Sequence, residues 1–206
     1  MVAIKVSIGP DFGERNMNEN PMRAAGVDFS RVPEQIATPR LILLKPELSH
    51  AAGFARGMNQ ASVSRNTASF PKYVPALSAE FWVFRARSNF ERGIAFAYVI
   101  TRQGSDEVVG VMDIFTNGDG QREIGYWIAR DHWGQGYATE AGHAVIDTLV
   151  AILGITEIEA GIYEDNSGSG RVLEKLGFQH MGAAPLLFSV SRGRSDPGYR
   201  YKWTTQ

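Results

Sequence analysis

The sequence predicts a mixed α/β fold of the α+β class, with one mostly antiparallel central sheet and helices on both of its faces. Two observations support this prediction. Three strand-like segments follow one another with only short turns rich in Gly, Asn and Asp between them, which is typical of antiparallel neighbours. A long helical segment then leads into a further strand, as a crossover connection does.

The first elements of the predicted fold are a strand and a short helix. Residues 38–46 (TPRLILLKP) form the strand, which Pro46 ends. In residues 47–60, apolar side chains recur at helical spacing after Ser49, which is a candidate helix cap. We therefore expect a short helix there.

A longer helix is predicted for residues 78–93 (SAEFWVFRARSNFERG). Ser78 is a suitable cap, and an acidic residue in the first turn complements the helix dipole. Phe81, Phe84 and Ala86 are expected to form its apolar side.

The rest of the chain combines strands and helices. The strands are expected at 94–102, 107–115, 122–129, 155–163, 178–183 and 198–204, and the helices at 138–153 and 167–177. Gly154 and Gly177 stand where these two helices should end, as glycine commonly does.

Length and composition limit the possible classes of protein. The chain has 206 residues and a net charge of −1, which suits one domain and provides no basic field to collect nucleic acid. We place this domain at 37–206, after a turn-rich extension at 1–36 that is either partly ordered or a dimer arm. The absence of cysteine excludes disulfides and thiol chemistry. Without an apolar run long enough for a membrane helix, or a signal peptide, we expect a cytoplasmic protein.

A glycine-bearing loop, residues 131–136, precedes the helix expected at 138–153. The first N–H groups of a helix have no acceptor within it, and the helix dipole adds about half a positive charge, so phosphate is a natural ligand there. Gly134 and Gly136 would let such a ligand approach the backbone. The loop lacks the lysine of an NTPase phosphate loop, and Thr139 replaces the last glycine of the dinucleotide fingerprint. Taken alone, it is equally compatible with a structural turn.

Two segments together resemble the GNAT (GCN5-related N-acetyltransferase) superfamily. They are residues 122–146 (REIGYWIARDHWGQGYATEAGHAVI) and 164–178 (EDNSGSGRVLEKLGF). The chain looks closest to the RimJ/RimL-like branch, which acetylates ribosomal-protein N-termini and includes small-molecule acetyltransferases, and the resemblance covers roughly residues 38–205. It implies a sheet of about seven strands with a V-shaped splay between the fourth and fifth.

The resemblance also implies acetyl-CoA as the acetyl donor. In the family, pantetheine pairs with the exposed edge of the fourth strand and completes an edge that is otherwise unpaired. That edge corresponds to Trp127, Ile128 and Ala129. The family holds the pyrophosphate on the glycine loop, which corresponds to Gly134, Gln135, Gly136, Tyr137 and Ala138. Trp133 stands where the general family pattern has Gln or Arg, as is common in this branch.

Three residues are candidates for the chemistry, because acetyl transfer needs a neutral amine and a stabilised thiolate leaving group. Glu123 stands where many relatives hold an acidic residue and is the candidate base; the alternative is a solvated or ion-paired strand residue. Asn166 matches a family asparagine that orients pantetheine or water; the alternative is a helix cap. Ser169 matches the N-x-x-S pattern and is the candidate donor to the thiolate, since Leu173 replaces the tyrosine that other members use; a first-turn helical serine is the alternative.

The acceptor is the least defined part of the prediction. Without cysteine, we expect direct transfer in a ternary complex to a primary amine, either a peptide or protein N-terminus or a small molecule. Its identity depends on the unpatterned loops at 59–77 and 184–197. We expect no metal site, no nucleic-acid partner and no membrane partner, and a homodimer is compatible with the sequence. The alternatives are a non-catalytic CoA-binding sensor or interaction module, and a protein for another phosphate ligand.

Overall fold

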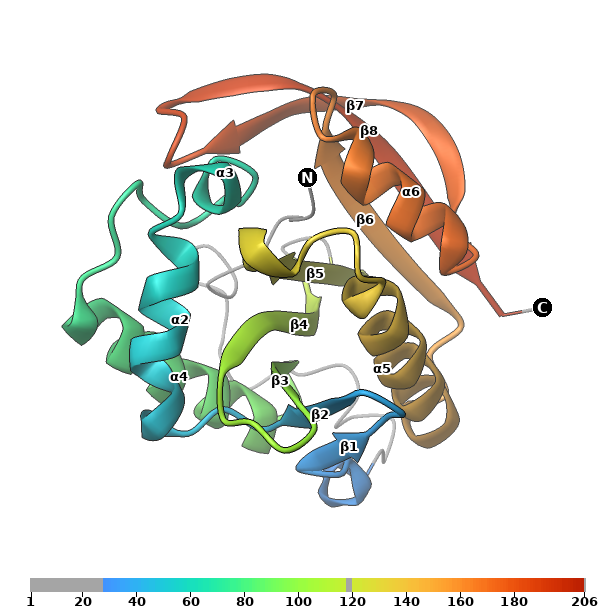
Figure 1. The fold of residues 1–206 in the computed structure, drawn as a ribbon. Coiled ribbons are helices and arrows are strands. Elements are labelled where there is room, and N and C mark those ends of the chain that lie inside the picture. The colour runs from blue at the N-terminus through green and yellow to red at the C-terminus, as the bar shows by residue number, and fades with distance from the viewer. Residues whose placement is uncertain (1–27, 118–119, 206) are drawn as a thin grey trace.

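A single eight-stranded sheet organises the computed structural model, which describes residues 28–117 and 120–205 (Figure 1). The strands are β1 (Gln35–Ala37), β2 (Leu41–Leu44), β3 (Ala95–Arg102), β4 (Val108–Thr116), β5 (Arg122–Ile128), β6 (Glu157–Tyr163), β7 (Gln179–Ser189) and β8 (Arg194–Thr204). The α-helices are α2 (Ala51–Met58), α3 (Ala61–Ser64), α4 (Ala76–Glu91), α5 (Tyr137–Leu153) and α6 (Ser167–Lys175). Short 3-10 helices lie at η1 (Phe29–Arg31), η2 (Leu48–His50) and η3 (Arg130–His132). The predicted fold class is confirmed.

The sheet order is β1-β2-β3-β4-β5-β6-β8-β7, and all neighbouring strands are antiparallel except β5 and β6. These two strands are parallel and are joined by a single pair of opposed residues, Glu123 and Glu159. Along its other edge, β5 pairs with β4 from Arg122 to Ile128. Beyond Glu123, the edge of β5 that faces β6 therefore has no strand partner among the described residues, and the splay expected between the family's fourth and fifth strands lies here.

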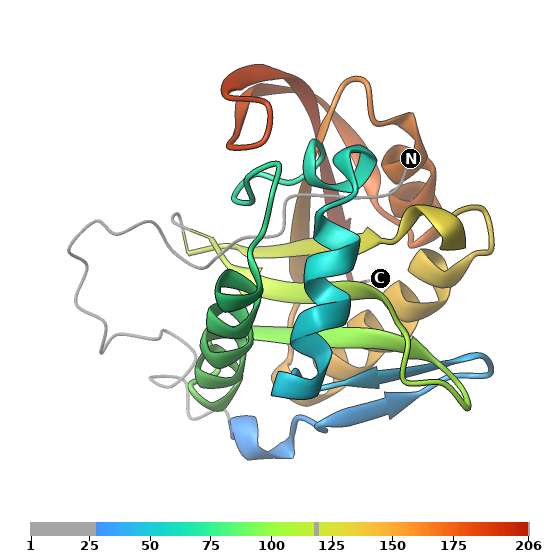
Figure 2. The same cartoon turned by 60° about the vertical axis from the view of Figure 1, so that its left-hand side comes forward.

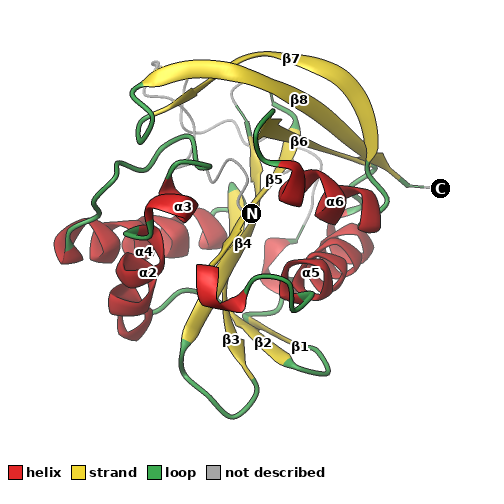
Figure 3. Cartoon of the chain, turned by 45° about the horizontal axis from the view of Figure 1, so that its top comes forward, coloured by secondary structure: helices red, strands yellow, loops and turns green. Residues whose placement is uncertain are grey.

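The helices cover the two faces of the sheet separately. Figures 2 and 3 show α2 and α4 on one face and α5 on the other, with α6 beside α5. Side chains of β5 alternate between the two cores: Trp127 is buried with α2 and α4, whereas Ile124, Tyr126 and Ile128 are buried with α5. This alternation assigns every residue of β5 to a face.

The described chain contributes to the domain before residue 37. Strand β1 pairs with β2, opposing Gln35 to Leu44, and Val32 is buried in the core on the α5 face. The sheet thus begins two residues before the boundary expected from the sequence. The greater part of the expected extension, including any dimer arm at 1–27, lies outside the described residues.

Helix α4 differs from its prediction in its start and its buried side. The helix begins at Ala76 after Pro75, so Ser78 lies within its first turn and caps nothing. Phe81 and Phe84 are 59% and 58% exposed, and the buried residues are Ala79, Trp82, Val83, Ala86 and Phe90. Apolar residues occur around the whole circumference of α4, so their spacing did not identify a unique core side. The candidate cap Ser49 likewise lies in η2, before α2 begins.

The segment 184–197, expected as a loop, is mostly strand. β7 continues to Ser189 and β8 starts at Arg194, so the two form a long hairpin at the sheet edge. Their register shifts between His180 and Gly182 and again between Ala184 and Leu187. Such irregularities break the two-residue alternation that identifies a strand in a sequence. None of the described helices is long and apolar enough to cross a membrane.

Helix α2 lies so close to β5 that Gly57 has no room for a side chain. A Cβ at Gly57 would come within 2.3 and 2.4 Å of two indole atoms of Trp127, which is fully buried. Helix propensity alone predicts that Gly57→Ala stabilises by about 1 kcal/mol. Overpacking of a rigid core opposes it by about 1–3 kcal/mol or more. We therefore expect a net loss in the free energy of unfolding, measured in urea.

Ala52→Gly is the matched control for this measurement, because Ala52 is exposed on the same helix. It should lose about 0.5–1 kcal/mol through propensity alone. A stabilised Gly57→Ala variant would show that Trp127 yields easily, and that the close approach of α2 to β5 is not a constraint.

Candidate functional site

The open edge of β5 carries the main-chain groups of Tyr126 and Ile128. The Ala129 N–H donates to the carbonyl of Val109 at 2.8 Å, next to β4. Main-chain groups of successive strand residues point in opposite directions. Trp127 and Ala129 therefore turn their main-chain groups toward β4, and Tyr126 and Ile128 turn theirs toward the splay.

Trp133 forms a hydrogen bond with one of the main-chain groups on this edge. Its indole N–H donates to the Ile128 carbonyl at 2.6 Å. Of the three residues expected to pair with pantetheine, only Ile128 turns a main-chain group toward the splay, and its N–H remains for a ligand there. Tyr126, which was not among the three, also turns its main-chain groups toward the splay. The alternation follows from the pairing with β4, which the sequence pattern did not specify.

The glycine loop adopts the backbone that only glycine adopts readily. Gly134 and Gly136 have φ angles of 76° and 81°, in the left-handed region. Gly136 precedes the first residue of α5, and no side chain caps this helix start. A Cβ on Gly134 would meet no atom within 4 Å, so the space outside the loop is open. The first N–H groups of α5 border that space, as an anion site requires.

A cavity of about 240 Å³ lies at this helix start. Its walls come from the end of β5, the glycine loop, the first turn of α5 and one side of α6: Ile128, His132, Trp133, Gly134, Gly136, Tyr137, Ala138, Thr139, Gly168, Arg171, Val172 and Lys175. The open edge of β5 and the loop therefore border one space. Arg171 and Lys175 of α6 bring two positive charges to its wall.

Arg40, on the β1–β2 turn, forms hydrogen bonds that fix the glycine loop in place. The sequence analysis did not identify this residue. Its guanidinium donates from Nε to Glu140 Oε2 at 2.6 Å and from Nη1 to the Gln135 carbonyl at 2.8 Å. The Arg40 N–H and the Thr38 hydroxyl both donate to Glu140 Oε1, at 3.0 and 2.6 Å. The guanidinium also lies 5.0 Å from the centre of the Tyr137 ring. The β1–β2 turn thus fixes both the loop and the first turn of α5.

Glu123 lies at the closed end of the splay. It is 2% exposed, it opposes Phe115 on β4, and the Asn117 amide lies 3.5 Å from its Oε2. Its position in the alternation of β5 puts it on the α2/α4 face. The neighbouring Arg122 donates to the Ile94 carbonyl at 3.5 Å, and burial lowers the pKa of this guanidinium to about 10.

Asn166 and Ser169 lie at the opposite, open end. Both are fully buried at the start of α6, where the Ser169 N–H donates to the Asn166 carbonyl at 3.1 Å. The Tyr126 hydroxyl donates to the Ser169 carbonyl at 3.4 Å, and burial raises the pKa of Tyr126. Glu159, which opposes Glu123, is roughly 13 Å along β6 from the end of that strand. The structure therefore unites Asn166 and Ser169 but separates them from Glu123.

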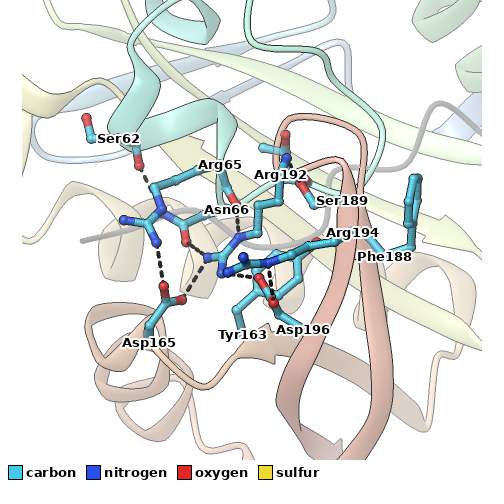
Figure 4. Close-up of polar contacts among 11 residues, drawn as sticks. Ser62, Arg65, Asn66, Tyr163, Asp165, Phe188, Ser189, Arg192, Arg194 and Asp196 are labelled. Atoms are coloured by element: carbon cyan, nitrogen blue, oxygen red, sulfur yellow. Dashed lines mark hydrogen bonds and ion pairs between the residues drawn. The ribbon is translucent and has the colours of Figure 1, made fainter.

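The tip of the β7–β8 hairpin is bound to the α3 region through Arg192 (Figure 4). The Arg192 side chain is 8% exposed and pairs with Asp165 at 2.7 Å and Asp196 at 2.9 Å. Its Nε donates to the Arg65 carbonyl at 2.6 Å, and its guanidinium lies 4.1 Å from the centre of the Tyr163 ring. The hairpin tip, the loop after α3 and the end of β6 therefore meet at one side chain.

Main-chain contacts reinforce this junction. The Val190 N–H donates to the Ala68 carbonyl at 2.9 Å, and the Ser189 hydroxyl donates to the Thr67 carbonyl at 2.9 Å. The two segments from which acceptor specificity was expected, 59–77 and 184–197, are thus in direct contact.

Three of the histidines, His50, His132 and His180, each have different neighbours. His50 Nδ1 accepts from the Glu47 N–H at 3.0 Å, and burial lowers its pKa. His132 lies 3.5 Å from Glu107 and borders the cavity, and His180 packs against Tyr199. In the described part of the chain, no three His, Asp or Glu side chains gather as a metal site would need.

Comparison with known proteins is consistent with this geometry. A family model for the acetyltransferase (GNAT) domain matches residues 40–179. The uncharacterized N-acetyltransferase p20 of Bacillus licheniformis is 30% identical over 151 residues, which are 72% of this chain and 84% of that protein.

Solved structures share the fold. RimJ of Mycobacterium smegmatis, in complex with CoA-disulfide, has a TM-score of 0.74 at 22% identity and covers 84% of this chain and 88% of its own. The microcin C7 self-immunity acetyltransferase MccE, in complex with acetyl-CoA and AMP, has a TM-score of 0.73 at 21% identity and covers 86% of this chain and 100% of its own.

The Arg40–Glu140 pair should be energetically coupled. Burial alone would raise the pKa of Glu140, but hydrogen bonds from Thr38 and Arg40 outweigh it and hold the pKa below its ordinary 4.5. In a double-mutant cycle of Arg40→Ala and Glu140→Gln at pH 7, we expect a coupling of at least about 0.5 kcal/mol. A carboxyl with a depressed pKa stabilises above its unfolded-state pKa. The coupling should therefore vanish as the pH falls below about 4.5 and through the folded-state value.

Arg102 and Glu107 provide the control pair, since both are more than 40% exposed and share one contact of 2.9 Å. Their coupling should be smaller, within the usual 0–1 kcal/mol or so of surface pairs. Equal coupling in the two cycles would mean that Arg40 contributes no more than a surface ion pair.

Proposed function

Because this chain belongs to the GNAT acetyltransferase family, we propose that it is an acetyl-CoA-dependent N-acetyltransferase that acetylates a primary amine directly, in a ternary complex. The observation that carries the proposal is the continuity of three features around one cavity: the unpaired edge of β5, the left-handed glycine loop and the uncapped start of α5. An amide-bearing arm ending in a pyrophosphate requires an open strand edge beside an anion site. Acetyl-CoA supplies that arm and the activated acetyl group.

The donor would be held mostly by main-chain groups. Tyr126 and Ile128 offer hydrogen bonds to pantetheine along the splay. The pyrophosphate would lie on the loop and first helical turn, on the N–H groups of Gly134, Gln135, Gly136, Tyr137 and Ala138. Arg171 and Lys175 add positive charge beside it. The residues present therefore fit the donor that the family uses.

The acceptor would approach from the α2/α4 face, where Glu123 is the proposed base. An ammonium has no free electron pair, so the amine must lose a proton before it can attack a thioester. Glu123 lies in the splayed strand on that face and can accept this proton directly or through water. Its low exposure keeps bulk solvent from competing for the same position.

Asn166 and Ser169 would act on the donor side. Both are buried at the open end of the splay, near the main-chain edge assigned to pantetheine. Asn166 would orient the arm or a bound water, and Ser169 would donate toward the departing thiolate. The attacking nitrogen and the departing sulfur are bonded to one carbon of the intermediate, so water would carry the amine proton to Glu123 along the splay.

Two solved relatives contain CoA-type ligands, which supports acetyl-CoA as the donor here. MccE was solved with acetyl-CoA, and RimJ with a CoA-disulfide. We propose a peptide or protein N-terminus or a small-molecule amine as acceptor here. The contact between the loop after α3 and the β7–β8 hairpin would shape its entrance.

Substitution in the glycine loop should weaken donor binding specifically. Gly134 and Gly154 have φ angles of 76° and 63°, and a Cβ on either would meet no atom within 4 Å. Gly134→Ala and Gly154→Ala should therefore both cost about 1–2 kcal/mol of stability, because left-handed backbone is strained for alanine. They lie at opposite ends of α5. Only Gly134→Ala should raise the Kd for CoA measured by calorimetry, by about tenfold, and equal affinities would exclude the loop as the pyrophosphate site.

Removal of the proposed base should strongly lower turnover and preserve donor binding. We expect Glu123→Gln to lower kcat by about 10²-fold or more with unchanged CoA affinity, assayed by CoA release with a panel of amines. Glu157→Gln, an exposed carboxyl on the neighbouring strand, is the control. Unchanged turnover across the pH range would refute the role of Glu123. Tight CoA binding by the wild-type chain without release from any amine would favour the sensor or interaction module instead.

A further inference from the structure

Asp113 is a buried carboxylic acid for which the reaction above has no use. It lies in the middle of β4, where it opposes Ala97 on β3 and Gly125 on β5. Gly125 belongs to the same face as Trp127, so Asp113 points to the α2/α4 face, as Glu123 does. Two acids therefore share the face from which the acceptor would approach.

The Asp113 carboxyl is incompletely satisfied. It is 5% exposed, and its Oδ1 has no hydrogen-bond partner. No described residue forms an ion pair with it, and burial raises its pKa to about 7. A buried polar atom without a partner costs about 1–3 kcal/mol, and more if it is charged. Such an atom in a native site calls for a partner supplied by something else.

The neighbours of Asp113 on the two adjacent strands have small side chains. Ala97 and Gly125 flank it on the adjacent strands with the two smallest side-chain types. Trp127, one position diagonal to Asp113, also has a buried indole N–H without a partner. The polar atoms around Gly125 are thus an acceptor and a donor that the described chain does not satisfy.

Asp113 and Glu123 are neighbours on this face of the sheet. Glu123 opposes Phe115, two residues beyond Asp113, so the two acids occupy diagonal positions whose separation is about 7–8 Å. Glu123 is as buried as Asp113. An amine at Glu123 is therefore separated from Asp113 by a distance that a short carbon chain spans.

We propose that Asp113 is a specificity-determining residue that binds a second N–H-bearing group of the acceptor, while the reacting amine lies at Glu123. The ligand class is a primary amine with a further ammonium or amide N–H about two to four bonds along its chain. This inference rests on the proposed function for the orientation of the acceptor, but the binding preference itself does not require catalysis.

The competing explanation is a structural carboxyl, satisfied by water. That explanation predicts that Asp113 influences stability alone and leaves the choice among amines unchanged. The two explanations differ in a ratio of affinities, which is insensitive to the amount of folded protein.

The test compares three amines on the CoA-bound protein by calorimetry: propylamine, 1,3-diaminopropane and glycinamide. The first has no second N–H group, the second has an ammonium and the third an amide. We expect the wild-type chain to bind at least one of the latter two about tenfold tighter than propylamine, because a hydrogen bond to a charged group is worth that much. Whichever of these two amines binds more tightly shows whether Asp113 prefers an ammonium or an amide N–H.

Asp113→Asn should bring this ratio close to one while CoA affinity stays unchanged. Asp106→Asn, an exposed carboxyl on the β3–β4 turn, should keep the wild-type ratio. Asp113→Ser provides a second variant if the amide misfolds, and Glu123→Gln should retain the preference despite losing turnover. An equal ratio in the wild-type chain, or an unchanged ratio in both Asp113 variants, would overturn the proposal. If the preference is lost in these variants but the wild-type chain turns over none of the amines, the role of Asp113 would be upheld and the proposed reaction would be contradicted.

Discussion

The organisation of this protein depends on one incomplete pairing, between β5 and β6. Two parallel strands that meet at Glu123 and Glu159 alone must diverge beyond that point, because their neighbours β4 and β8 each hold them by continuous antiparallel ladders. Divergence leaves main-chain donors and acceptors of β5 without a strand partner. In a buried part of a sheet this arrangement is costly unless something else pairs with the edge. Trp133 satisfies the carbonyl of Ile128, and the rest of the edge borders the cavity at the start of α5.

The second half of the site depends on how α5 begins. Left-handed Gly136 turns the chain directly into the helix, without a capping side chain, so the first N–H groups stay available. A loop so rich in glycine would lose much backbone entropy on ordering, and Arg40 offsets this cost by joining Gln135 to Glu140. The glycine loop is therefore braced by Arg40 although two of its own residues have no side chain. A substrate that is held by main-chain groups needs such external support, because no long side chain can adjust to it.

The sequence was most informative where the signal was local. The order of elements, the glycine loop and the helix that follows it were recognisable because each has its own periodicity or turn chemistry. The errors have a different origin. Apolar residues occur on all sides of α4, and Phe81 and Phe84 stay exposed. Packing selects the buried side: Trp82 stacks on Phe54 of α2, and Phe90 packs against β3. The long β7–β8 hairpin escaped prediction because two register shifts break its alternation. Arg40 and Arg192 contact residues far away in the chain, and no local pattern indicates such partners.

The faces of β5 explain why donor and acceptor functions can be separated in this fold. Main-chain groups of Tyr126 and Ile128 point sideways into the splay, whereas the side chains of Glu123 and Trp127 project onto the α2/α4 face. One strand can therefore present its edge to a donor and its face to an acceptor without competition between them. Gly125 lies between the two side chains and opposes Asp113 on β4. Because glycine has no side chain, β5 places none between Glu123 and Trp127 on the face where Asp113 lies.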